Sequence, residues 1–319
     1  MRDRAERILN LVADRYVRTA RPVPSATVAA ELDVSSATVR SAFGSLEEAG
    51  LLHQPHTSAG RIPTALGFRR YANAFLPPEP LPEIARDALR RRLAGAHGDV
   101  LLHQLASVAA ELSGYAVVVR VAADPNVHAL EIHLSMLHAR ALLAVVVLAN
   151  GLVRQVRVDL EPAPDDEVLG DAERHLRQLT LPVAEIPNAL AALAATAEPE
   201  LARTLRAIRD AWPEVTPPRV ASAGLSNVLN EPEARDPAFV RLVVERVERP
   251  TGAEPQVGDL VLAWDQGIAA VATRWDATLG GTLTLIGPAR LRYGRALQVV
   301  GGVAAALAHE PDAVAGAIA

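Results

Sequence analysis

Apolar residues at the start of the chain recur at the spacing of short amphipathic helices. A helix over residues 4–19 is predicted by an apolar residue at every third or fourth position, and the prolines that follow end it. A second short helix comes next, and we expect Ser25 to cap it. Either Ser35 or Ser36 can cap a third helix. The N-terminal segment therefore predicts three packed helices.

The third of these helices has one apolar face and one small, polar face. Val39, Phe43 and Leu46 fall at helical spacing and are expected to face the core. A helix that enters the major groove of DNA needs short side chains, so that its backbone comes close, and a few long donors that reach base edges. The other face suits this, although an ordinary solvated surface is the alternative. The candidate DNA contacts here are Ser35, Ser36, Ala37, Thr38, Arg40 and Ser41.

A short polar hairpin is predicted directly after this helix. Gly50 ends the helix, residues 51–53 start a strand, and Ile62 begins the return strand. Helix, turn, helix and hairpin in this order predict a winged helix over residues 1–76. A loop with hydroxyls, free backbone N–H groups and one arginine can fill the space beside a helix in the major groove. The candidate contacts to phosphate or the minor groove are His56, Thr57, Ser58, Gly60 and Arg61.

Two of these hairpin residues have another interpretation. His56 can pack against the hairpin, and Arg61 can be a plain surface arginine. Its place at a glycine-hinged tip favours the DNA contact for Arg61.

The rest of the chain is predicted to hold one α+β domain in two pieces. Residues 77–82 are rich in proline and form a stiff linker. Segments rich in Val and Leu, typical of strands in an antiparallel sheet, lie between residues 115 and 158 and again between residues 260 and 286. We therefore assign residues 83–160 and 219–319 to the two halves of one domain.

Residues 161–218 interrupt this domain and differ from it in composition. They carry 11 acidic and five basic residues, with apolar residues at helical spacing. A segment of about 55 residues buries little core by itself and is more stable when it packs on a partner. We therefore expect an inserted helical domain that dimerises the chain.

Charge is distributed unevenly along the 319 residues. Residues 1–75 hold ten arginines against seven acidic residues, a net charge of +3, whereas the remainder has 22 against 30, a net charge of −8. This agrees with binding of nucleic acid by the N-terminal end alone.

All 32 positions counted as Lys or Arg are arginine. The planar guanidinium suits phosphate, although biased genome composition explains this usage at least as well. We expect the run at residues 90–92 to be a solvated helix face, with a secondary phosphate contact as the alternative.

Residues and motifs that are missing from the chain count against an enzyme, a metalloprotein and a membrane protein. Without cysteine there is no disulfide, cysteine-ligated zinc or cysteine nucleophile. Phosphate-binding loops and the nucleophile elbow are missing, so we expect no enzyme activity. His128, His133 and His138 lack the convergent spacing of a metal site, and we expect no metal and no other cofactor. The chain has neither a membrane-spanning apolar run nor a signal core at its N-terminus, so we expect a cytoplasmic protein.

Several segments resemble the heat-inducible transcription repressors of the HrcA family. The resemblance rests on Ser-Ser-Ala-Thr-Val-Arg at residues 35–40 and above all on Pro-His-Thr-Ser-Ala-Gly-Arg-Ile-Pro-Thr at residues 55–64. It recurs at residues 224–233 and 281–293, so it spans nearly the whole chain. Ser41 departs from the family, which usually has asparagine there. A hydroxyl cannot make the bidentate adenine contact of an amide, so the base preference at this position stays open.

The resemblance implies an α+β multidomain fold. Its parts are an N-terminal winged helix-turn-helix and a GAF-like domain interrupted by a helical insertion that serves dimerisation. The resemblance also implies a dimeric repressor of chaperone operons. Such a homodimer binds double-stranded DNA at an inverted-repeat operator of the CIRCE type, a chaperonin helps to keep it active, and heat stress lifts repression.

Two other functions fit the residues. A winged-helix regulator could be controlled by a small metabolite in the GAF-like domain, which would need a pocket lined by convergent polar groups. A pure interaction protein would use the winged helix to bind another protein and would show no salt-dependent affinity for DNA.

Overall fold

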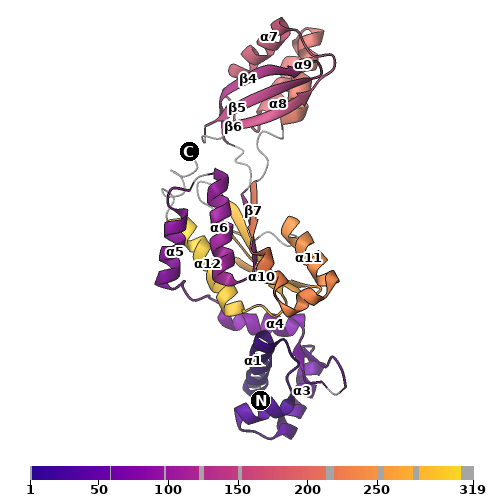
Figure 1. Cartoon of the computed structure of the whole chain (residues 1–319), viewed down its shortest axis with the longest axis vertical. Helices are drawn as coiled ribbons and strands as arrows, with labels where there is room; N and C mark the ends of the chain where they lie inside the picture. The colour runs from indigo at the N-terminus through magenta and orange to yellow at the C-terminus, as the bar shows by residue number, and fades with distance from the viewer. Residues whose placement is uncertain are drawn as a thin grey trace. The chain divides into compact units, whose positions relative to one another are not determined.

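The chain folds into an α+β protein that divides into two compact units (Figure 1). The computed structural model describes residues 2–57, 59–96, 98–121, 126–149, 153–212, 219–249, 255–275 and 280–309. Unit 1 comprises Met1–Ala94, Leu101–Arg120 and Val220–Glu310, and unit 2 is built around Val121–Arg219.

Unit 1 begins with a head of three helices and a hairpin, in the predicted order. Its elements are α1 (Arg2–Thr19), α2 (Ser25–Leu32), α3 (Ser36–Glu48), β1 (Leu52–His53), β2 (Ile62–Pro63), α4 (Ala65–Ala72) and the short η1 (Asn73–Phe75). Val39, Phe43 and Leu46 of α3 are buried in the head with residues of α1 and α2, which confirms the predicted apolar face. Gly50 follows α3 with φ of 69°, a left-handed conformation that glycine adopts without strain.

Local capping was predicted correctly at α3 and wrongly at α2. Ser35 caps α3, because its side chain accepts a hydrogen bond from the Thr38 N–H at 3.1 Å. The cap position of α2 is Pro24, which has no side-chain acceptor, and Ser25 is already the first helical residue. The extended backbone that proline favours begins the helix one residue earlier than expected.

A sheet of five strands in the order β7-β3-β10-β9-β8 forms the core of unit 1. The strands are β3 (Ala116–Val121), β7 (Arg219–Ala223), β8 (Leu260–Asp265), β9 (Ile268–Trp275) and β10 (Gly281–Pro288). β9 pairs antiparallel with both β8 and β10. Helix α12 (Tyr293–His309) packs on β9 and β10, and α11 (Pro237–Glu248) packs on β10. The remaining helices of this unit are α5 (Glu83–Leu93), α6 (Gly98–Ser113), α10 (Leu225–Leu229) and η3 (Pro232–Arg235).

Unit 2 is a three-stranded antiparallel sheet with helices on one face. The strands β4 (Ala129–His138), β5 (Ala141–Leu148) and β6 (Val153–Asp159) lie in that order. The helices are α7 (Asp166–Arg177), α8 (Ile186–Thr196) and α9 (Pro199–Ala211). Asp165 caps α7 by accepting a hydrogen bond from the Val168 N–H at 2.9 Å.

The domain boundary expected at residue 161 does not agree with this division. Strands β4–β6 were expected to belong with residues 83–160, but they share a buried apolar cluster with α7–α9. The cause is the alternation of side chains along the strands, which turns one apolar face of the sheet toward these helices. The helical segment therefore has a core of its own within unit 2. Dimerisation no longer follows from a missing core.

The proline-rich residues 77–82 are packed and do not separate two compact units. Leu81 is buried, and a Cβ on Gly302 of α12 would lie 2.3 Å from the Leu81 side chain. Gln298 of α12 donates a hydrogen bond from Nε2 to the Pro80 carbonyl at 2.9 Å. The head and the five-stranded sheet accordingly belong to the same unit.

Candidate nucleic-acid interface

The exposed face of α3 brings together the residues predicted to read DNA. Ser35, Ala37, Arg40 and Ser41 are exposed, and Ser36 and Thr38 are half-buried. The Ser35 and Thr38 hydroxyls lie 2.8 Å apart and are engaged in the cap. Arg40 donates from Nε to the Ser36 carbonyl at 3.3 Å. The face therefore presents one guanidinium among short side chains.

Arg40 differs in its electrostatic setting from the paired arginines of the head. Four head arginines are paired with carboxylates: Arg15 with Glu31 (2.6 Å), Arg18 with Asp14 (3.0 Å), Arg61 with Glu47 (2.8 Å) and Arg70 with Glu6 (3.1 Å). Within the described residues Arg40 has no carboxylate partner. Its positive charge is therefore available to an external phosphate or base.

The loop between β1 and β2 is held by Gln54, which the sequence did not single out. Its Nε2 donates to the Thr57 carbonyl at 2.8 Å and to the Ala59 carbonyl at 3.0 Å. His56 and Thr57 are exposed on the loop, whereas Ser58 lies outside the described residues. An amide before a polar loop is the available signal, because asparagine or glutamine offers two N–H donors to neighbouring carbonyls.

Gly60 allows the hairpin to approach the segment before α2. The N–H and carbonyl of Arg61 both pair with Val23, each at 2.9 Å. A Cβ on Gly60 would lie 2.2 Å from the Val23 carbonyl carbon, so only glycine fits. Gly60 thus serves a close backbone approach, and its contact with DNA stays a prediction.

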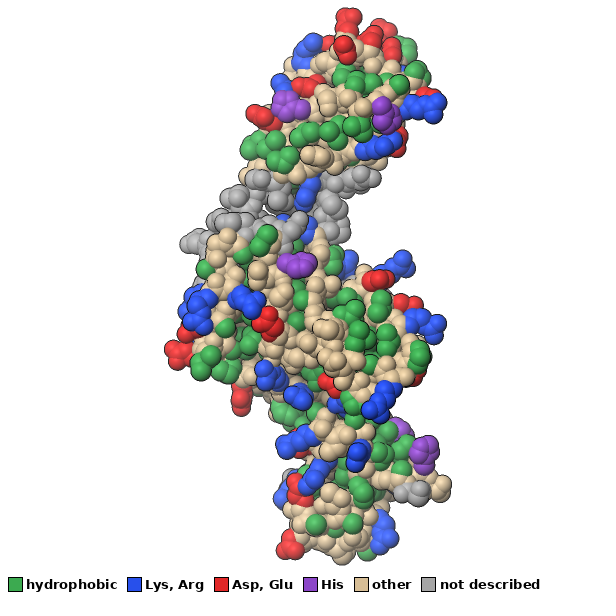
Figure 2. Space-filling model, in the orientation of Figure 1, with side chains coloured by type: hydrophobic (Ala, Val, Ile, Leu, Met, Phe, Trp, Pro, Cys, Tyr) green, Lys and Arg blue, Asp and Glu red, His purple; other side chains and the backbone are tan. Residues whose placement is uncertain are grey.

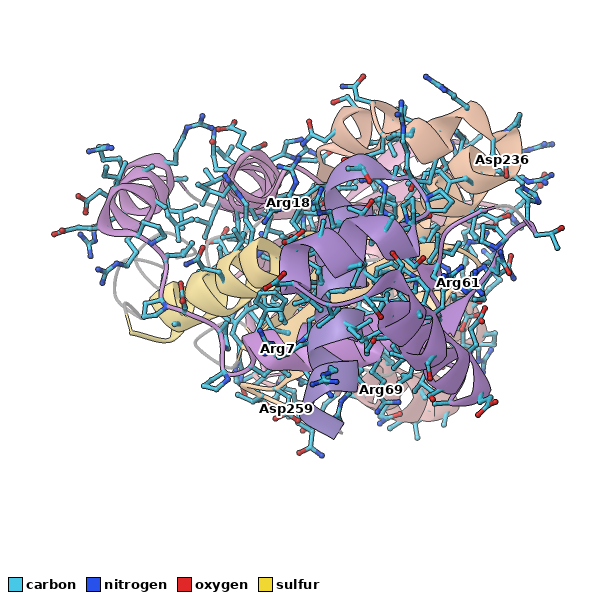
Figure 3. The ribbon with its side chains drawn as sticks, turned by 90° about the horizontal axis from the view of Figure 1, so that it is seen from below. Arg7, Arg18, Arg61, Arg69, Asp236 and Asp259 are labelled. Atoms are coloured by element: carbon cyan, nitrogen blue, oxygen red, sulfur yellow. The ribbon has the colours of Figure 1, made fainter. Side chains whose placement is uncertain are left out.

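The Arg61 side chain lies against α3. Its Nε is 2.8 Å from Glu47 Oε1, an ion pair that lacks the alignment of a hydrogen bond. Its Cζ lies 5.7 Å from the centre of the Phe43 ring, within cation–π range. Only 19% of the side chain is exposed. Figure 3 shows Arg61 on a different side of the head from Arg7 and Arg18. Arg61 therefore fastens the hairpin to α3, and a phosphate contact requires this pair to open.

Among the described residues there is no group of three or more His, Cys, Asp or Glu placed to hold a metal ion. His133 instead contacts Arg177 at 2.6 Å. In the same part of the chain no helix is long and apolar enough to cross a membrane.

A hollow of about 500 Å³ lies between η1, the proline-rich segment and α12. Phe75, Leu81 and Val299 contribute apolar walls. Its polar side chains are Glu79, Arg295 and Gln298, and the last two already donate to the Leu112 and Pro80 carbonyls of the chain itself. One carboxylate beside two engaged donors is not the set of convergent polar groups that would favour a small metabolite.

The fold and the α3 face define the class of protein. A capped helix with a small, hydroxylated, singly basic face, set beside a short hairpin on an α+β protein, is an arrangement used by helix-turn-helix transcription regulators. The chain belongs to the HrcA family, since the family described as HrcA protein C terminal domain matches residues 99–297.

Relatives and a solved structure extend the match over the head. The heat-inducible transcription repressor HrcA of Thermosynechococcus vestitus is 30% identical, over 93% of this chain and 94% of that protein. The same-named protein of Parasynechococcus marenigrum is 31% identical, over 94% and 96%, and that of Brevibacillus brevis is 27% identical, over 96% and 97%. A crystal structure described as a hypothetical protein shares the fold, with a TM-score of 0.63, 21% identity and coverage of 97% and 98%. HrcA proteins are transcription repressors and not a class of enzymes.

Proposed function

We propose that this chain is a heat-inducible transcription repressor of the cytoplasm that binds double-stranded DNA through a winged helix-turn-helix head. The observation that carries the proposal is the α3 face, where Arg40 lies exposed among short side chains without a carboxylate partner in the described chain. The names of its full-length relatives support the same function.

In this proposal α3 lies in the major groove and the hairpin lies over the neighbouring backbone. The short residues Ser36, Ala37 and Ser41 let the helix come close to the bases, and Arg40 reaches a base edge or a phosphate. His56 and Thr57 contact phosphate or the minor groove, with Ser58 and Gly60 beside them. Arg61 holds the hairpin at the correct distance from α3 through Glu47.

We further propose a homodimer that presents two heads to an inverted repeat. Support comes from the outer face of β4–β6. Leu143, Val145 and Val147 of the central strand are only half-buried there, and Val153 of β6 is 54% exposed. Figure 2 shows hydrophobic side chains gathered on this unit. An apolar patch of this kind marks an interaction surface.

The five-stranded sheet of unit 1 would be the GAF-like domain.

The operator and the signal follow from the resemblance to the family. The operator is of the CIRCE type and controls chaperone operons, and a chaperonin keeps the repressor active until heat stress. The description of the relatives as heat-inducible supports this proposal.

Replacing Arg40 by alanine tests the proposed recognition face. We expect Arg40→Ala to weaken binding to the inverted repeat by about 1–3 kcal/mol, roughly 5- to 150-fold. Gel-shift titrations at two salt concentrations would use the inverted repeat and a scrambled duplex. Arg69→Ala is the matched control, because Arg69 is an exposed arginine on α4. Equal affinities of Arg40→Ala and the parent chain for the inverted repeat would contradict the assignment.

A further inference from the structure

Arg290 is a buried arginine in the loop between β10 and α12. Its side chain is only 7% exposed, and it is the one buried charged residue in the described part of the chain. Nε and Nη2 bind the two carboxylate oxygens of Glu233 at 2.6 and 2.8 Å, and Nη2 also binds Glu231 at 2.5 Å. Two carboxylates from the η3 segment therefore hold one guanidinium by its forked geometry.

The remaining nitrogen of Arg290 reaches into the head. Nη1 donates to the Val17 carbonyl at 3.1 Å. Val17 lies in the last turn of α1, where backbone carbonyls lack a partner within the helix and the dipole favours a positive charge. A cation from unit 1's sheet region thus caps the first helix of the head. The contact joins segments that are 273 residues apart in the chain.

Aromatic rings fill the seam beside this contact. The chain has only three Trp, four Tyr and four Phe. Six of these rings form one connected cluster between head and sheet, namely Tyr16, Phe68, Tyr71, Phe75, Trp264 and Tyr293. Burial raises the pKa of Tyr71 to about 12, as expected where water is excluded.

These two sets of contacts have different physical consequences. Apolar and aromatic burial attaches the head, but it is weakly directional. Hydrogen bonds from a planar guanidinium are directional, and they fix the angle at which α1 leaves the seam. A tilt of about 10° at one end of a helix about 27 Å long moves its other end by about 5 Å. That shift exceeds the rise of about 3.4 Å between base pairs.

We propose that Arg290, held by Glu231 and Glu233, is a positioning residue that sets the orientation of the DNA-binding head. This rests on the proposed function. The fixed orientation lets both heads of a dimer engage their half-sites together, and the second contact then forms at a high effective concentration. Arg290 itself does not touch DNA.

Arg290→Lys tests this role, because it keeps the buried positive charge and loses the forked geometry. Kd values of the full chain would be measured for a single half-site and for the inverted repeat. We expect half-site affinity within twofold of the parent chain and a loss of tenfold or more for the inverted repeat. If Arg290 only stabilised the fold, the substitution would weaken binding to the half-site and to the inverted repeat by the same factor. The matched control is Arg246→Lys, which alters a partly exposed ion pair with Asp265 elsewhere in unit 1.

A second measurement reports the orientation of the head in the absence of DNA. Since the chain has no cysteine, spin labels can be placed at Glu48→Cys on α3 and Arg241→Cys on α11, both exposed. We expect a narrow distance distribution that Arg290→Lys broadens and Arg246→Lys leaves unchanged.

Each outcome decides one of the two proposals. An unchanged distance distribution in Arg290→Lys overturns the positioning role, and so does an equal loss of affinity for both DNAs. A parent chain that binds neither DNA overturns the proposed function. In that case the distance measurement still tests whether Arg290 sets the orientation of the head.

Discussion

At the scale of single residues, the sequence predicted contacts between near neighbours in the chain and missed contacts between distant segments. The cap of α3 was predicted as Ser35 or Ser36, and the structure has Ser35, because a cap and its N–H partner lie within three residues of each other in the chain. Gly60 and Arg61 were chosen for DNA contact, yet their nearest partners are Val23 and Glu47. Such partners are distant in the chain, and no local pattern reveals them. The same holds for Arg290 and Val17.

Gly60→Ala should destabilise the head. The new Cβ would overlap the Val23 carbonyl group, and backbone atoms on both sides must shift, at a cost of about 1–3 kcal/mol. Urea unfolding measures this. Gly44→Ala is the control, because no atom beyond the neighbouring residues and the backbone of its own helix lies within 4 Å of the added Cβ, and alanine should stabilise the helix interior by about 0.5–1 kcal/mol. A Gly60→Ala variant as stable as the parent chain, or more stable, would show that the close approach does not matter.

At the scale of elements, spacing predicted which segments are helices and strands, but not which strands share a sheet. Segments over β3–β6 all showed Val- and Leu-rich strand patterns. Only β3 joined the five-stranded sheet, whereas β4–β6 formed their own. The alternation of side chains shows which face of a strand is buried. It does not show which strand or helix packs against that face.

Ser35→Ala should loosen the first turn of α3. Loss of the side-chain acceptor leaves the Thr38 N–H without its cap and costs about 1 kcal/mol. Faster hydrogen exchange at the first amides of α3 would report the loosening, and binding to the inverted repeat should weaken with it. Ser45→Ala on the same helix is the control, since that hydroxyl only bonds back to the Ser41 carbonyl. Unchanged exchange at residues 36–39 would argue against the cap.

At the scale of the whole molecule, the inserted segment proved larger than predicted. It includes three strands as well as helices, and the apolar faces of the strands and of the helices pack against each other. What is left for a partner is the half-buried stripe on the outer face of β5. The sequence could not distinguish a segment that needs a partner from one that packs on neighbouring strands.

Val145→Glu should convert the proposed dimer into a monomer. A carboxylate in an apolar interface loses hydration without gaining a partner, which strongly disfavours association. Light scattering of the full chain measures the mass. Ala192→Glu, at an exposed position of α8, is the matched control and should remain dimeric. The reverse result would place the interface on the helices, and a monomeric parent chain would refute the homodimer.

The connection between the two units has an evolutionary consequence. The chain leaves the five-stranded sheet at the end of β3, Val121, and returns at the start of β7, Arg219. These two strands are hydrogen-bonded neighbours, so the host sheet needs only a turn at this place. Loop tips of this kind tolerate the arrival of a foreign domain. Unit 2 therefore has the connectivity of a guest acquired by insertion, and the sequences of host and guest are free to diverge at separate rates.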